Sequence, residues 1–375
     1  MNILEENNYH DHSKDTPNKW IVIIILLLSL VGIIYSFSKS TGGGVLGGIV
    51  QEIKSEQDIT LEIGGKTKIV KEQTLSILIE EGKESRNVEI INDYKPVAKG
   101  DKIFVRGSLF GDSEFTMVDI SRTTALIFLF MFFVVLVIVV GGWKGIYSLI
   151  GLIFTFAVIF VFLVPQILAG APPVWIGVAS ATIILLPTLY LSYGLNKKSI
   201  AAFLGIILSL FLVGLVANYF VEVLKFTGLS EASMYLDMET AGPINLLGLM
   251  VAGIIIAAVG VLDDVAVIQS SVVFSLSRAN SEFRGAKLFR EAMRVGKDHI
   301  SAVVNTLVLA YTGASLPLIL LLSLQNMSPG YFASTEVVAE EILRTLVSSS
   351  GLLLAVPLTT IIAVFVVDRF NKNSK

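Results

Sequence analysis

Residues 244–269, which read INLLGLMVAGIIIAAVGVLDDVAVIQ, decide the fold of this protein. A transmembrane helix needs about 20 mostly apolar residues, because the hydrocarbon core of a bilayer is about 30 Å thick and each helical residue adds about 1.5 Å. The stretch meets this length, and its charged residues are Asp263 and Asp264. It therefore predicts a membrane-spanning helix with two adjacent acids inside it.

The composition of the whole chain favours the same environment. Of its 375 residues, 54% are hydrophobic and only 16% are charged, and the mean hydropathy is +0.76. A water-soluble enzyme does not need so apolar a composition. The net charge of −3 lacks the basic excess of a nucleic-acid binder, so we expect no nucleic-acid partner. Cysteine is absent, which excludes disulfides and thiolate metal sites.

Seven further stretches share this length and apolar character, so we expect a predominantly α-helical integral membrane protein. The eight predicted transmembrane helices are residues 20–37, 125–142, 146–164, 175–193, 200–221, 244–269, 300–324 and 349–367. The first could instead be a signal peptide with Lys14 and Lys19 as its basic region. Its length, and the lack of a small-x-small cleavage motif after it, favour a retained anchor.

The distribution of basic residues predicts the orientation of these helices. If the N-terminus is cytoplasmic, the short outer loops hold only Lys225 and Arg344, whereas the cytoplasmic loops and tails hold a clear basic excess. We therefore expect a multipass protein of the cell membrane with both termini in the cytoplasm. The predicted parts are cytoplasmic tails at 1–19 and 369–375, an extracytoplasmic domain at 38–122 and a seven-helix membrane domain at 123–368.

The extracytoplasmic domain has the pattern of a small β-rich fold. Residues 59–63, 68–70, 88–91 and 102–106 are rich in β-branched side chains, and Gly-Gly, Asn-Asp and Gly-Asp pairs separate them. This pattern predicts an OB-like barrel or a sandwich. OB barrels bind oligonucleotides or sugars through exposed aromatic side chains, but the segment has few of these. We therefore favour a folding or docking module for it.

Residues 275–298 form a predicted cytoplasmic amphipathic segment. Basic side chains from Arg284 to Lys297 alternate with apolar ones near helical spacing. Such a segment would lie on the inner leaflet and meet anionic lipids, each basic residue contributing about 1 kcal/mol near the surface. A site for a nucleotide or protein effector is the weaker alternative, because no Walker or dinucleotide-binding glycine motif accompanies it.

The two acids of the sixth predicted span are the main candidates for function. A carboxylate at the centre of a membrane helix costs about 2.5–3.5 kcal/mol on insertion scales, so its presence suggests a role. Two neighbouring desolvated acids can bind and release a proton, which equips them for a proton relay. Two alternatives stay open. The span could end near Leu262 and leave the acids in the headgroup region, or the acids could serve helix packing.

The seventh predicted span supplies polar partners for these acids. Its side chains Ser301, Asn305, Thr312 and Ser315 share one helical face, and Asp298 and His299 lie at its cytoplasmic entrance. The hydroxyl and amide groups could bond a carboxyl group or line a wet path. They could equally hold helices together, at about 0.6 kcal/mol per bond. His299 could relay protons or simply be an interfacial side chain.

No cofactor is expected, and the sequence contains no arrangement typical of a catalytic site. With three histidines and no cysteine, the sequence gives little support for a transition-metal centre. A hard cation held by Asp263, Asp264 and Asn305 is conceivable, so the metal question stays open. We find no HExxH or GxSxG motif of the kind a membrane enzyme would use. We therefore expect no enzymatic activity.

The second half of the chain resembles the YibE/F family of bacterial multispanning membrane proteins. The motifs that carry this resemblance are GVLDDVAV at 260–267, GKDHIS at 296–301, NTLVLAYTGASLPL at 305–318, AEEILR at 339–344 and GLLLAVPLT at 351–359. The resemblance continues through GLNKKS at 194–199 and, more weakly, to about Gly42. The family pattern has one Asp before Val-Ala-Val. It therefore implies a role for Asp264 and leaves that of Asp263 less secure.

A looser similarity links the sixth and seventh spans to resistance-nodulation-division permeases and the SecD/SecF export factors. These also carry Asp or Asp-Asp in an apolar helix, followed by a polar span that ends near Leu-Pro-Leu, here residues 316–318. We therefore expect a proton- or cation-coupled transporter or export component, which would use a second copy or a companion membrane subunit. The alternative is a noncatalytic scaffold or sensor whose outer domain binds a ligand or partner protein.

Overall fold

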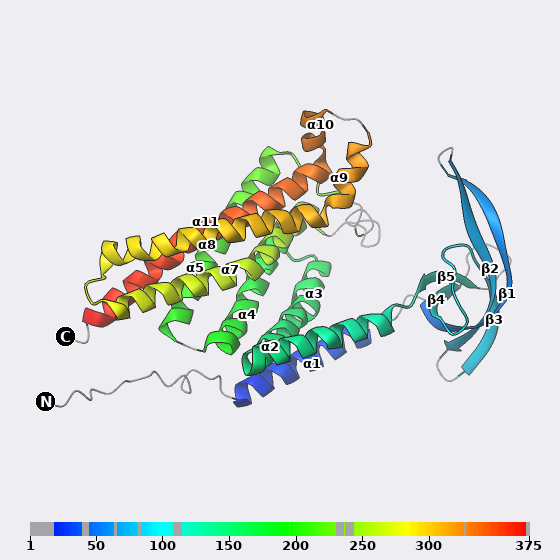
Figure 1. The fold of residues 1–375 in the computed structure, drawn as a ribbon, viewed down its shortest axis with the longest axis horizontal. Coiled ribbons are helices and arrows are strands. Elements are labelled where there is room, and N and C mark those ends of the chain that lie inside the picture. Colours follow the sequence, from blue (N-terminus) through cyan, green and yellow to red (C-terminus); the bar gives the residue numbers. More distant parts are fainter. Residues whose placement is uncertain are drawn as a thin grey trace. The chain divides into compact units, whose positions relative to one another are not determined.

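A computed structural model describes most of the chain, and it divides into two units. The described residues are 19–39, 45–63, 66–81, 84–107, 115–194, 196–229, 236, 244–325 and 328–372. One unit is helical and comprises residues 1–36 and 143–375, and the other comprises residues 37–142 and contains a β-sheet. We describe each unit separately (Figure 1).

The helices follow the apolar stretches of the sequence. In chain order they are α1 Lys19–Lys39, α2 Thr123–Val158, the π-helix η2 Ile159–Leu163, α3 Val164–Leu168, α4 Pro173–Tyr193, α5 Lys197–Val223, α7 Leu246–Ala279, α8 Gly285–Ala314, α9 Leu316–Ser323, α10 Pro329–Ser334 and α11 Glu336–Lys372. All eight predicted spans fall on these helices.

Among the described residues, five helical stretches are long and apolar enough to cross a membrane, or six if α8 and α9 count as one bent span. They begin with the run Thr123–Leu168, which contains two of the predicted spans. Gly142 interrupts this run with φ 55° and ψ −137°, a conformation that favours glycine. The apolar part of α1, Trp20–Ile33, is shorter. The protein is therefore a helical membrane protein by composition, and the count of eight spans stays a prediction.

The region after α7 differs from the prediction in two ways. The predicted amphipathic segment 275–298 is divided, since α7 runs to Ala279 and α8 begins at Gly285. The basic stretch and most of the predicted span 300–324 then form one continuous helix, α8. That span also bends by 59° between α8 and α9. Pro317 explains the bend, because proline lacks a backbone donor and disfavours a helical residue before it.

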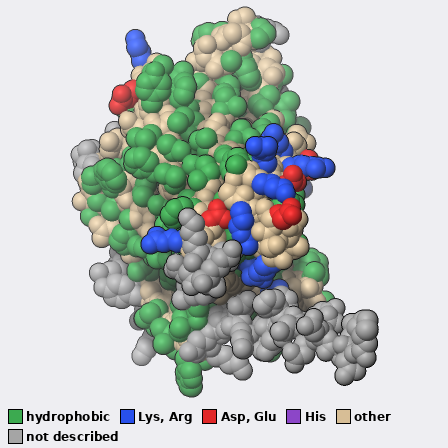
Figure 2. Space-filling model, turned by 90° about the vertical axis from the view of Figure 1, so that its left-hand side faces the viewer, with side chains coloured by type: hydrophobic (Ala, Val, Ile, Leu, Met, Phe, Trp, Pro, Cys, Tyr) green, Lys and Arg blue, Asp and Glu red, His purple; other side chains and the backbone are tan. Residues whose placement is uncertain are grey.

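Charged and apolar side chains separate on the molecular surface. Figure 2 shows a face on which hydrophobic side chains are spread widely, whereas most, though not all, of the charged side chains gather in one region. Helix α8 has the same contrast along its length, because its exposed charges, such as Arg294 and Lys297, precede apolar residues such as Leu307 and Leu309. This is the division expected of a helix that passes from water into an apolar medium.

Small residues let the central helices of the helical unit approach closely. Helix α7 contacts α4, α5 and α11, and α5 contacts α11. A Cβ atom at Gly205 of α5 would lie 2.1 Å from Thr359 Oγ1 and 2.9 Å from Thr359 Cα of α11. Gly351 of α11 similarly faces Val213 of α5, at 2.3 Å from an added Cβ. The α5–α11 contact therefore depends on the absence of side chains, as is common between membrane helices.

This contact predicts that Gly205→Ala destabilises the helical unit. The new methyl group would overlap backbone as well as side-chain atoms, so we expect the free energy of unfolding to fall by about 1–3 kcal/mol. SDS titration of the purified full chain, followed by tryptophan fluorescence, measures the change. Gly253→Ala is the matched control, because nothing lies within 4 Å of an added Cβ there. Equal stability of the two variants would contradict the close contact.

The sheet of the other unit has five antiparallel strands in the order β3-β2-β1-β4-β5. They are β1 Val45–Ile63, β2 Lys66–Glu81, β3 Glu84–Asn92, β4 Lys102–Gly107 and β5 Phe115–Ile120. The edge strands β3 and β5 also contact each other, so the sheet curls toward a barrel. This arrangement agrees with a partly open OB-like barrel. The described residues form one sheet and not the two layers of a sandwich.

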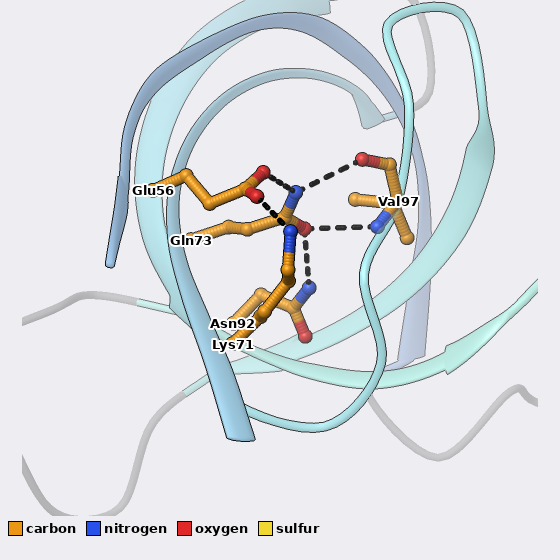
Figure 3. A network of polar contacts seen from close by, with 5 residues as sticks. All are labelled: Glu56, Lys71, Gln73, Asn92 and Val97. Atoms are coloured by element: carbon orange, nitrogen blue, oxygen red, sulfur yellow. Dashed lines mark hydrogen bonds and ion pairs between the residues drawn. The ribbon is translucent and has the colours of Figure 1, made fainter. Parts of the chain in front are cut away.

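A polar network holds the β3–β4 connection against this sheet (Figure 3). Gln73 is buried, and its Oε1 accepts hydrogen bonds from Val97 N at 2.8 Å and Asn92 Nδ2 at 3.2 Å. Its Nε2 donates to Val97 O at 3.2 Å and to Glu56 Oε2 at 3.0 Å. Hydrogen bonds from Lys71 and then from Gln73 lower the pKa of Glu56. One amide side chain thus joins β1, β2, β3 and the following connection.

We therefore predict that Gln73→Leu loosens the sheet. The substitution leaves the backbone N–H and C=O of Val97 without their side-chain partner, which costs about 1–3 kcal/mol, whereas Asn92 Nδ2 keeps its bond to Lys95 O at 2.7 Å. Hydrogen exchange measured by mass spectrometry on the full chain should show faster exchange in residues 84–100. Gln57→Leu is the control, because Gln57 is exposed and bonds only across the β1–β2 hairpin. Unchanged exchange in the Gln73 variant would count against the network.

Candidate functional site

Helix α7 carries both candidate acids without a break. Its first turn is capped by Asn245, whose Oδ1 accepts a hydrogen bond from Gly248 N at 2.9 Å. The helix then runs through Asp263 and Asp264 to Ala279. The helix itself does not end near Leu262, and the place where the membrane span ends along it stays a prediction. Both acids therefore lie inside a helix that is apolar and long enough to span a membrane.

Asp264 is exposed and lies in a groove between α7 and α8. The groove has a volume of about 500 Å³ and is lined mainly by apolar side chains. Its polar lining residues are Asp264 from α7 and His299 and Thr306 from α8. We call this the α7–α8 groove. A carboxyl group, an imidazole and a hydroxyl group thus share one small, mostly apolar space.

Asp263 has a different environment, although it is the next residue. It is half-buried, and its Oδ1 atom is sealed from solvent with no hydrogen-bond partner among the described residues. Its helical neighbours Leu262 and Ala266 are fully buried. Consecutive helical side chains project about 100° apart, which explains why the two carboxyl groups do not share one environment. A buried polar atom without a partner costs free energy, so the residue is poorly satisfied in this arrangement.

The polar face predicted for the seventh span is distributed over several places. Of its members, Ser301 and Asn305 are exposed and do not line the α7–α8 groove. Ser301 Oγ donates to Lys297 O of its own helix at 3.4 Å. Thr312 and Ser315 line a second pocket further along the chain. Of the two entrance residues, His299 lines the groove and Asp298 is exposed outside it.

Sequence reasoning missed Thr306 and Gln269. Thr306 shares the groove with His299 because seven residues are almost two helical turns, a spacing that the sequence already contained. Gln269 is 3% exposed, and its Nε2 donates to Ala292 O at 3.1 Å and to Thr360 Oγ1 at 2.7 Å. This amide joins α7 to α8 and α11. It carried no signal in the sequence, since its partners lie far away along the chain.

The Gln269 contacts position the groove. Gly296 lies opposite this side chain, and a Cβ atom there would be 2.7 Å from Gln269 Oε1 and 2.7 Å from Val356 Cγ1. Helix α8 is therefore held against α7 and α11 one turn before His299. Because His299 follows on the next turn of α8, this close contact also fixes the position of His299 relative to Asp264.

The described residues include no group of three or more His, Asp or Glu side chains that could hold a metal ion. The cation site considered from the sequence combines Asp263, Asp264 and Asn305. Of these three residues, only Asp264 lines the α7–α8 groove. The groove therefore offers one carboxyl group and one imidazole more clearly than a cation cage.

The helices and their composition define a multipass membrane protein. A model of the YibE/F-like protein family matches residues 129–369, and the chain belongs to this family. The match includes Asp264 and His299 and does not include the five-stranded sheet. No curated protein and no solved structure matches the chain.

The groove predicts a sharp difference in water access along α7. The sequence lacks cysteine, so a single cysteine substitution introduces the only thiol that can react. Asp264→Cys should react with a membrane-impermeant, charged methanethiosulfonate added to permeabilised membranes, because the groove is open. Ala266→Cys should stay unreactive, because that side chain is 0% exposed. We expect at least a tenfold difference in labelling rate, and equal rates would rule out an open groove at Asp264.

Proposed function

We propose that the protein is a proton- or cation-coupled transporter or export component. The observation that carries the proposal is the exposed Asp264 carboxyl group in the same groove as His299, on a helix whose charged residues in this apolar region are Asp264 and its neighbour Asp263. An ionisable residue inside a membrane helix is expensive, and such residues typically mark ion pathways or proton relays. A carboxyl–imidazole pair can pass a proton between its two members.

In this proposal Asp264 is the titrating group and His299 delivers or removes its proton. The hydroxyl group of Thr306 donates to Ala302 O at 3.0 Å, so its oxygen can accept a hydrogen bond from a water molecule between them. Asp263 modulates the pair, because charge on one carboxyl group opposes charge on its neighbour. Ser301, Asn305, Thr312 and Ser315 extend the polar surface of α8 beyond the groove. No catalytic step and no cofactor belong to the proposal.

In this proposal, the conformational change is a change in the packing of α8 against α7. The Gln269 bonds hold these helices together on one side of the groove, whereas the α8–α9 bend provides a break on the other. Broken helices are common where transporters bind and release their cargo. Neutralising Asp264 would remove a charge from the groove and favour closer approach of α8. Proton binding could thereby be tied to a change in helix packing.

The proposed setting is a cell membrane with eight spans, both termini in the cytoplasm and the sheet outside. The excess of basic residues in the cytoplasmic segments supports this orientation. Lipids are the proposed partners of the exposed apolar surfaces and of the basic half of α8. A second copy or a companion membrane subunit would complete the wall of a transport path.

A noncatalytic scaffold or sensor is the second candidate. The observation that favours it is the curled five-stranded sheet, whose long β1–β2 hairpin offers a surface for a ligand or partner protein. In that case the helices would serve as an anchor, and the acids of α7 would not take part in any activity.

Substitution of Asp264 separates the two candidates. In proteoliposomes that contain a pH-sensitive dye, the intact protein should speed proton entry after an external acid pulse. Asp264→Asn removes the titrating group and keeps the shape, so we expect proton entry to slow at least tenfold at equal reconstitution. Asp298→Asn is the matched control, because it removes an exposed acid of α8 that lies outside the groove.

Two results of these measurements would contradict the transporter proposal. If the Asp264→Asn protein and the intact protein admit protons at the same rate, and also Na⁺ in a parallel assay with a sodium-sensitive dye, the scaffold or sensor is favoured. Asp264→Leu adds a second criterion. A Leu variant that is more stable and conducts protons normally would mean that the carboxyl group is not required.

A further inference from the structure

A second pocket lies at the bend between α8 and α9, away from the acids of α7. Helices α8, α9, α10 and α11 all contribute to it, and its volume is about 280 Å³. The pocket exists because the chain turns by 59° at the end of α8 and returns through α10 to α11. Ser328 caps α10 by accepting a hydrogen bond from Tyr331 N at 3.4 Å. We call this space the elbow pocket.

The walls of the elbow pocket are mostly apolar, and two are aromatic. Leu318 and Ile319 of α9 and several aliphatic side chains of α11 line it, together with Tyr311 of α8 and Phe332 of α10. Apolar walls of this size suit a compact organic group. Aromatic faces also attract organic cations, because the ring carries negative potential on its face. The lining therefore favours a ligand that is both apolar and positively charged.

The charge of the elbow pocket also favours a positively charged ligand. Among its lining residues, Glu341 is the one with a charged side chain. Glu341 shares a single cation, Arg344, with Glu340, at 2.9 Å and 2.8 Å. When both carboxyl groups are ionised, one guanidinium between them leaves an excess of one negative charge. All three side chains are less than one-third exposed, so water screens this excess less than it would at an open surface.

We propose that the elbow pocket binds a lipophilic organic cation. Hydroxyl groups of Tyr311, Thr312, Ser315 and Thr345 also line the pocket, but it has one carboxylate and its remaining walls are hydrocarbon, which suits an organic cation better than a hydrated metal ion. A neutral acyl chain would not use the excess charge, and an anionic amphiphile would be repelled by it. The proposal concerns a site distinct from the α7–α8 groove and goes beyond proton coupling. It does not depend on Asp264.

Two probes of the same shape and opposite charge test the proposal. Tetraphenylphosphonium and tetraphenylborate are both apolar tetraphenyl ions, so a surface that binds only through apolar contacts would bind either of them. The full-length protein in nanodiscs of zwitterionic lipid should bind radiolabelled tetraphenylphosphonium above empty nanodiscs. Tetraphenylborate should show no saturable binding. Equal binding of the two ions would overturn the proposal and identify a lipid-filled groove.

Variants of the lining residues locate the bound cation. Glu341→Gln removes the charge and leaves Arg344 paired with Glu340, so we expect the protein to fold and the affinity for tetraphenylphosphonium to fall about tenfold. Glu341→Asp keeps the charge and should retain most of the affinity. Phe332→Leu keeps an apolar wall without a ring and should lower the affinity about threefold or more. Glu222→Gln is the control, because it removes an exposed acid of α5 outside the pocket.

The outcomes separate this site from the proposed proton relay. Asp264→Asn should bind tetraphenylphosphonium as the intact protein does, even where it admits no protons. Binding that is lost in Asp264→Asn and kept in Glu341→Gln would place the cation in the α7–α8 groove and overturn the proposal. A normal affinity in both Glu341→Gln and Phe332→Leu would overturn it as well.

Discussion

The unbroken course of α7 through two adjacent acids is the constraint on which the candidate site depends. A continuous helix fixes the angle between consecutive side chains at about 100°, so Asp263 and Asp264 cannot both face the same neighbour. One carboxyl group turns partly into the packed interior, and the other faces the α7–α8 groove. The surrounding helices must then satisfy two requirements, close packing on one side of α7 and an opening on the other.

Small residues make the close packing possible, and α8 forms one wall of the opening. Gly205 and Gly351 allow α5 and α11 to approach each other, and both helices also contact α7. Gln269 joins α7 to α8 and α11 through buried hydrogen bonds, so α8 is held near α7 where Gly296 permits contact. His299 follows on the next turn of α8. The imidazole therefore reaches the groove because of contacts made by Gln269 and Gly296, which do not titrate.

Much of the helical architecture could be predicted from the sequence, because apolar runs of sufficient length have few alternatives to helices. The two acids and His299 were also found in this way, since charge in an apolar stretch is conspicuous. The division of the polar face of α8 was not predictable. Ser301 and Asn305 share a face with Thr312 in a straight helix, but which part of it meets α7 depends on Gln269 and on the bend at Pro317.

Helix α8 connects two spaces of different chemistry, the α7–α8 groove and the elbow pocket. The groove offers a carboxyl group and an imidazole, which suit a proton, whereas the elbow pocket offers hydrocarbon, aromatic rings and an excess carboxylate. The YibE/F family match includes both spaces and leaves out the sheet. The similarity to the family thus lies in the helices.

The most direct test of this account is the height of the Asp264 carboxyl group in an experimental structure of the protein in a lipid nanodisc. The account predicts that this group lies between the two headgroup layers, in the α7–α8 groove beside His299. A carboxyl group in bulk water beyond the headgroups, or one that faces only acyl chains, would contradict it.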